Sequence, residues 1–181
     1  MRRLGRTSLL VLTVISCAAA QAEKGSGPDI TEVLKQFPGY HLLTMAERSA
    51  DASAFLLRHF SRTNASIVHA DFDGDGHQDY ALLLKHDGTE NAKFVILLCS
   101  DDSQCRTVYE LDVTATIAEM YLRPISKGSF VSQTEASDTN DFSPPTKLRG
   151  VGIQVNYFEK GAVVYYWSNK TRNIEMIDTE D

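Results

Sequence analysis

The stretch SIVHADFDGDGHQDYALLLK, residues 66–85, combines two hydrophobic runs with an acidic loop between them. The runs at 66–70 and 80–85 are rich in β-branched, aromatic and aliphatic residues and are typical of strands. Four aspartates lie within nine residues of the loop, namely Asp71, Asp73, Asp75 and Asp79. The stretch therefore predicts a strand–loop–strand unit whose loop must accommodate several negative charges.

The spacing of these aspartates is typical of a calcium-binding loop. Calcium requires several hard oxygen ligands on one small sphere, and side chains at loop positions 1, 3 and 5 converge when the backbone curls around the ion. With Asp71 at position 1, Asp73 and Asp75 take the next two positions, and Gly76 supplies a residue that tolerates positive φ. We predict that the carbonyl of His77 and the carboxylate of Asp79 complete the site.

The segment DFDGDGHQD, residues 71–79, resembles the D-x-D-x-D-G-x-x-D calcium loop of integrin-type FG-GAP and VCBS-like repeats, which are common in secreted bacterial proteins. In those families the loop joins two strands, whereas in an EF-hand it joins two helices. The β-rich flanks agree with the strand version, as does Leu82 at the position of the EF-hand glutamate. The chain has one copy of the loop and no FG…GAP signature, so the resemblance implies the ion site and says little about the global fold.

An acidic turn with solvated carboxylates is one alternative interpretation of the loop. Against it, close carboxylate pairs repel by about 1 kcal/mol even in high dielectric. Because the position 12 glutamate is absent, we expect a modest calcium Kd on the order of 10⁻⁴ to 10⁻³ M, as in extracellular modules.

A second alternative is an enzyme, because IVHADFDGD also resembles the first motif of haloacid-dehalogenase-type phosphatases. That resemblance implies Asp71 as phosphoryl-accepting nucleophile and Asp73 as general acid with Mg²⁺, and Asp101 and Asp102 as later metal ligands. Asp75 stands where that motif has threonine, and the sequence lacks the alternating strand and helix pattern of a parallel sheet. We therefore expect a calcium-binding protein and not an enzyme.

The N-terminal segment predicts export. Three arginines precede the apolar run LLVLTVISCAAA, which is too short to span a membrane, and residues 20–22 (AQA) fit a signal-peptidase site. Loss of residues 1–22 removes three arginines and no acidic residue, so the formal net charge changes from −6 to −9. This charge argues against nucleic acid and anionic membrane surfaces as partners.

The same segment leaves a lipid anchor open, because VISC fits a loose lipoprotein box with Cys17 as the lipid-bearing residue. We predict a signal peptide over 1–22, a spacer over 23–28 and a single domain over 29–181. The mature chain is expected to be periplasmic or secreted, or membrane-anchored through Cys17, and to bind a cell-envelope component or another exported protein.

Cys99 and Cys105 flank the short polar segment SDDSQ between two β-rich runs. In an oxidising compartment this arrangement predicts a disulfide across the neck of a hairpin. Five intervening residues are not the spacing of a redox motif.

The remaining pattern predicts an α+β domain with two short N-terminal helices and a mostly antiparallel sheet of about seven strands. The helices are expected at 29–37, with Asp29 as N-cap, and at 51–60. Residues 117–124 are ambiguous and 132–147 are expected to form a surface loop. In the last third of the chain, Val163, Tyr165 and Trp167 share one strand face, which we interpret as core and not as a sugar- or protein-binding platform. Strands are expected at 66–70, 80–85, 93–99, 106–113, 150–158, 162–168 and 173–178.

Overall fold

The computed structural model describes residues 28–60, 64–100, 104–133 and 144–179. The predicted signal peptide, with Cys17, and all but the last residue of the predicted spacer lie outside the described residues. Asp101 and Asp102 also lie outside them. Within the described residues no helix is long and apolar enough to cross a membrane.

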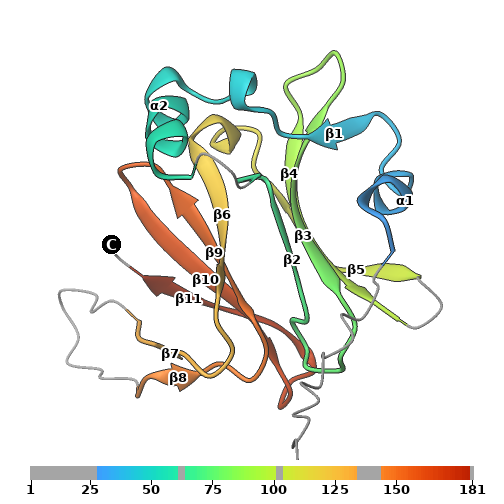
Figure 1. The fold of residues 1–181 in the computed structure, drawn as a ribbon, viewed down its shortest axis with the longest axis vertical. Helices are drawn as coiled ribbons and strands as arrows, with labels where there is room; N and C mark the ends of the chain where they lie inside the picture. Colours follow the sequence, from blue (N-terminus) through green and yellow to red (C-terminus); the bar gives the residue numbers. More distant parts are fainter. Residues whose placement is uncertain (1–27, 61–63, 101–103, 134–143, 180–181) are drawn as a thin grey trace, which may run out of the picture.

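The first sheet contains the acidic loop and is antiparallel throughout. Four of its strands follow one another in the chain as a meander, which confirms the predicted run of four strands (Figure 1). The fifth strand, β1, is short. It pairs with β3, which also pairs with β2, the first strand of the meander. The five strands are β1 (Tyr40–Leu42), β2 (Ile67–Ala70), β3 (Asp79–His86), β4 (Ala92–Cys99) and β5 (Cys105–Asp112).

The second sheet is also antiparallel, with the strand order β11-β10-β9-β6. Its strands are β6 (Met120–Ile125), β9 (Gly152–Tyr157), β10 (Gly161–Ser168) and β11 (Asn173–Thr179). A separate two-stranded ladder joins β7 (Phe130–Val131) to β8 (Thr146–Lys147).

The described residues form eleven strands, so the expected number of about seven was too low. The ambiguous segment 117–124 divides into a 3-10 turn, η2 (Ile117–Glu119), and strand β6. Pro124 weakens the strand signal of β6, and it is tolerated because β6 lies at the edge of its sheet. The prediction of a loop throughout 132–147 was wrong at β8, whose two residues are too few to show a periodic pattern.

Both predicted helices are present. Helix α1 spans Ile30–Leu34, and the Asp29 carboxylate accepts the predicted capping hydrogen bond from the Thr31 backbone N–H at 2.7 Å. Helix α1 is therefore shorter than predicted at its C-terminal end. Helix α2 spans Ala50–His59 and follows a 3-10 turn, η1 (Met45–Glu47).

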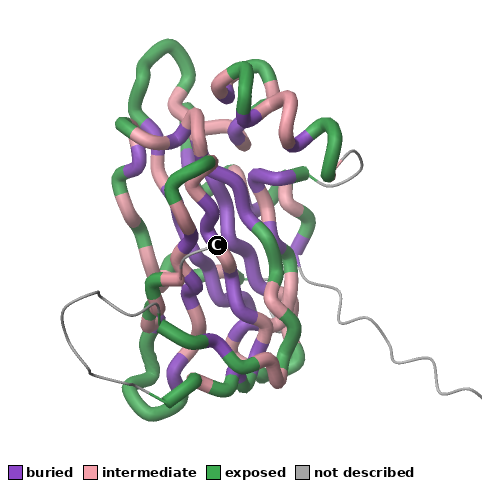
Figure 2. The backbone as a smooth tube through the Cα atoms, turned by 90° about the vertical axis from the view of Figure 1, so that its left-hand side faces the viewer, coloured by how far each residue is buried: buried purple, intermediate pink, exposed green. Residues whose placement is uncertain are grey.

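The core lies on both faces of the first sheet. On one face, residues such as Phe94 and Ile96 pack against Val155 of the second sheet. On the other face, Leu82 and Val95 lie in a cluster with residues of α1. Figure 2 shows the resulting band of buried backbone through the central strands. Because both faces of the sheet are covered, the sequences of β3 and β4 are largely continuous apolar runs, in which polar and apolar residues do not alternate.

The aromatic face of β10 belongs to this core, as predicted. Tyr165 is 3% exposed, and its ring centroid lies 5.1 Å from those of both Phe94 and Tyr109. Trp167 is partly buried against the same cluster. This face is therefore occupied by packing between the two sheets.

The inter-sheet core predicts a large penalty for truncating Phe94, which is fully buried. Phe94→Ala should lower the free energy of unfolding by about 3–5 kcal/mol, because it removes ring contacts and leaves a cavity. Phe130→Ala is the matched control, since the Phe130 ring is 68% exposed, and should change stability by about 0.5 kcal/mol or less. Urea denaturation measures both, and equal losses would contradict the assigned core.

Candidate metal centre

The acidic loop joins β2 to β3, which pair antiparallel as far as Ala70 opposite Asp79. The predicted strand–loop–strand unit is therefore confirmed, in contrast to the two helices of an EF-hand. Gly76 has a φ of +96°, as its predicted role requires, and Gly74 has a φ of +85°. Both glycines adopt the left-handed conformation that side chains disfavour.

Backbone N–H groups of the loop converge on the first aspartate. Gly74 N donates to Asp71 Oδ1 at 2.6 Å, and Gly76 N donates to Asp71 Oδ2 at 3.2 Å. Asp75 N donates to Asp73 Oδ1 at 3.1 Å. These hydrogen bonds curl the loop around its carboxylates, and each carboxylate oxygen retains acceptor capacity for a further partner.

Three of the four predicted carboxylates lie together. Asp71, Asp73 and Asp79 each offer one oxygen atom, and these atoms all lie within 4.8 Å of one another. Ligands at 2.3–2.6 Å from one calcium ion are separated by at most about 5 Å. The three oxygens are therefore close enough to share one ion, and all are hard donors that suit calcium or magnesium better than zinc.

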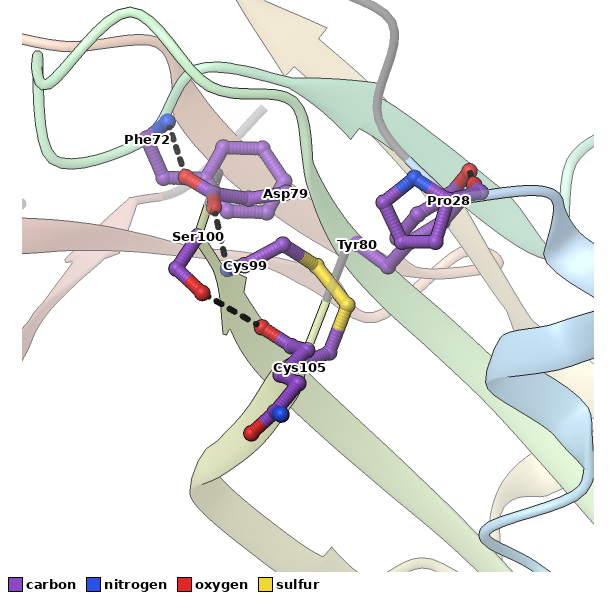
Figure 3. Close-up of a disulfide and its surroundings, with 8 residues drawn as sticks. Pro28, Phe72, Asp79, Tyr80, Cys99, Ser100 and Cys105 are labelled. Atoms are coloured by element: carbon purple, nitrogen blue, oxygen red, sulfur yellow. Dashed lines mark hydrogen bonds between the residues drawn. A yellow bond between two sulfur atoms is a disulfide. The ribbon is translucent and has the colours of Figure 1, made fainter. Parts of the chain in front are cut away.

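Asp79 is the most buried member of the group, with no exposed surface. Its Oδ2 accepts a hydrogen bond from Phe72 N at 2.8 Å, and its Oδ1 accepts one from Cys99 N at 2.9 Å (Figure 3). Burial raises the pKa of Asp79 to about 7, and the nearby charges of Asp73 and Asp75 act in the same direction. A bound cation would oppose this shift by favouring the carboxylate.

The pKa of Asp73 is also raised, first by burial and then by the charges of Asp75 and Asp71. The loop therefore holds carboxylates that disfavour one another's ionised forms. A divalent cation at their centre would convert this mutual repulsion into attraction.

Asp75 and His77 have a different arrangement from the other predicted ligands. Asp75 is exposed, lies outside the group of three carboxylates, and accepts a hydrogen bond from His77 N at 2.8 Å. With Asp73 it lines one wall of a cavity of about 310 Å³, whose other wall includes Gln104 and Arg106 of the β4–β5 hairpin. The proposed role of the His77 carbonyl as a ligand stays a prediction.

Three residues that sequence reasoning missed hold the loop in place. Phe72, between the first two aspartates, is 1% exposed and packs in the inter-sheet core. A Cβ atom on Gly150 would lie 1.9 Å from the Phe72 carbonyl oxygen. The next residue, Val151, donates its N–H to the Asp71 carbonyl at 3.1 Å. The segment before β9 therefore supports the loop from behind, and nothing in the local sequence pattern indicates this contact.

The predicted disulfide between Cys99 and Cys105 is confirmed. The two residues lie opposite each other in the β4–β5 ladder, with Cα atoms 4.0 Å apart. The bridge therefore restrains the end of β4 from which Cys99 N donates to Asp79.

The surroundings of the loop differ from those that the phosphatase resemblance implies. An antiparallel strand follows the loop, where a phosphatase of that type has a helix, and every strand pair in the described part of the chain is antiparallel. No family model, curated protein or solved structure matches the chain. The functional proposal therefore depends on the loop's own residues and geometry.

The contact behind the loop predicts that Gly150→Ala is destabilising. The added methyl group would overlap the Phe72 carbonyl, so the loop backbone must move. We expect a loss of about 1–3 kcal/mol in the free energy of unfolding. Arg149→Ala, at an exposed neighbouring position, should cost about 0.5 kcal/mol or less. Thermal melts of both variants test this, and an unchanged melting temperature for Gly150→Ala would refute the close contact.

The buried Asp79 carboxyl predicts a specific pH dependence in the metal-free protein. Its folded pKa of about 7 lies above the ordinary value of 3.8, so the folded state binds the proton more tightly than the unfolded state. Its contribution to stability is full below about pH 4 and is lost as pH rises to about 7, by an amount on the order of 4 kcal/mol. Urea denaturation in EDTA across this range should show that loss in the wild type.

Asp79→Asn provides the comparison, because an amide does not titrate. The variant will be less stable at low pH, since its amide N–H₂ cannot accept one of the two backbone hydrogen bonds. Its free energy of unfolding should nevertheless vary less with pH than that of the wild type. Parallel pH profiles for the two proteins would show that Asp79 is not the titrating group.

Proposed function

We propose that this chain is an exported calcium-binding protein in which one Ca²⁺ ion holds the loop between β2 and β3. The observation that supports the proposal is the convergence of Asp71, Asp73 and Asp79 at one point, with Asp79 fully buried. Asp75 and the His77 carbonyl are the further ligands proposed from the loop spacing, directly or through water. Calcium tolerates such a mixed and flexible oxygen set.

The proposed role of the ion is structural. The loop lies between paired strands, so an ion bound to Asp71 at its start and Asp79 at its end restrains the β2–β3 register. If free calcium exceeds the Kd a hundredfold, mass action adds about 2.7 kcal/mol to stability. With a Kd on the order of 10⁻⁴ to 10⁻³ M, the ion would be bound in calcium-rich extracellular surroundings.

Export is supported by the disulfide, because such bridges persist in oxidising compartments. We propose that the mature chain is periplasmic or secreted, or anchored by lipid at Cys17, and that it binds a cell-envelope component or another exported protein. In this proposal the ion stabilises the fold and the chain performs no catalysis.

Thermal melts of residues 23–181 in EGTA, in Ca²⁺ and in Mg²⁺ test the proposal. Calcium at about a hundred times the Kd should raise the melting temperature by several degrees, because about 2–3 kcal/mol of binding free energy is then added to a domain of this size. Magnesium should have a smaller effect, since it demands a stricter octahedral geometry. Equal melting temperatures in all three conditions would refute the calcium site.

Variants of the loop make the test specific. Asp73→Asn should abolish most of the calcium response, because Asp73 belongs to the converging group, and Asp75→Asn should reduce it less. Asp178→Asn, at an exposed position in β11, removes the same charge elsewhere and should leave the response unchanged. Release of phosphate from an aryl phosphate with Mg²⁺, abolished by Asp71→Asn, would instead identify an enzyme.

A further inference from the structure

Arg48 is a buried cation with an unused hydrogen-bond donor. It follows the turn η1 and is 7% exposed. Its Nη2 donates to Ser66 Oγ at 2.6 Å, and Ser66 Oγ in turn donates to the Leu43 carbonyl at 2.5 Å. Its Nη1 is buried and has no hydrogen-bond partner among the described residues. A buried donor without a partner is unusual in a folded protein and calls for an explanation.

The charge of Arg48 is also unpaired. Among the described residues no carboxylate forms an ion pair with it. The neighbouring Glu47 carboxylate instead binds His41 Nε2 at 2.9 Å and accepts hydrogen bonds from Thr44 N and Thr44 Oγ1 at 2.9 and 2.7 Å. Burial lowers the pKa of Arg48 to about 10, while the nearby charge of Glu47 acts in the opposite direction, so the guanidinium still carries its charge at neutral pH. A buried, unpaired charge is unfavourable unless an anion accompanies it.

A cavity of about 390 Å³ lies at this position. Among the described residues that line it, Arg48 is the one that carries a charge. The apolar part of the wall includes Leu42, Met45 and Ala65. Uncharged polar groups come from Thr44, Asn64 and Ser66. The volume lies within the range of small-molecule sites, which combine apolar walls with a few polar groups that fix orientation.

We propose that this cavity binds a small organic monocarboxylate, whose carboxylate pairs with the guanidinium of Arg48 and whose short apolar part contacts Leu42, Met45 and Ala65. One guanidinium matches one negative charge, and its planar N–H groups suit a carboxylate. A phosphate dianion would bring more charge than this lining balances. The site is separate from the acidic loop, so it does not depend on calcium binding.

Sodium butyrate and its neutral isostere butyramide are the probes, applied to residues 23–181 at constant ionic strength. Butyrate should raise the melting temperature saturably, in EDTA and in Ca²⁺ alike, whereas butyramide should not. Equal shifts with both probes, or no shift with butyrate, would overturn the proposal. A saturable shift with inorganic phosphate but not with butyrate would overturn the assignment to a carboxylate.

Variants at Arg48 test the role of the guanidinium. In Arg48→Met the apparent Kd for butyrate should weaken by about tenfold or more, because a charge-assisted hydrogen bond is lost. Arg172→Met, at an exposed position just before β11, should bind butyrate as the wild type does. Undiminished binding by Arg48→Met would overturn the proposal. If Arg48→Met does not fold, the butyrate and butyramide comparison on the wild type still decides it.

Discussion

The buried carboxylate of Asp79 is the constraint on which the acidic loop depends. Its two oxygens accept hydrogen bonds from the loop at Phe72 N and from the end of β4 at Cys99 N. Because the carboxylate has no exposed surface, water cannot replace either bond. One side chain thus joins the loop, the start of β3 and the disulfide-bridged hairpin, and it places an oxygen beside Asp71 and Asp73.

The two functional proposals rest on two buried groups of opposite charge, the Asp79 carboxylate and the Arg48 guanidinium. Asp79 has both oxygens hydrogen-bonded and lies among other acids, so a cation is the partner that would favour its ionised form. Arg48 forms no ion pair among the described residues, has one donor unused and lines a cavity whose other described lining residues are uncharged, so an anion is the partner that would pair its charge. In both cases the argument is the same: low local dielectric makes an uncompensated charge costly, and a ligand of opposite charge relieves the cost.

Sequence patterns located most of the elements because burial imposed strong local signals. The β3 and β4 runs are apolar on both faces, and Asp29 marks the start of α1 with a capping carboxylate. The missed strands gave no such signal, since β1, β7 and β8 have two or three residues each. Edge strand β6 contains a proline, which weakens the strand pattern in sequence.

The sequence by itself determined the acidic loop, its glycine at positive φ and the cysteine pair, because each depends on residues close together in the chain. Tertiary structure alone decided that Asp79, and not Asp75, joins Asp71 and Asp73, since strand pairing sets where each side chain lies. It also decided that Gly150 supports the loop at Phe72, 78 residues earlier in the chain, through a contact between backbones that carries no local sequence signal.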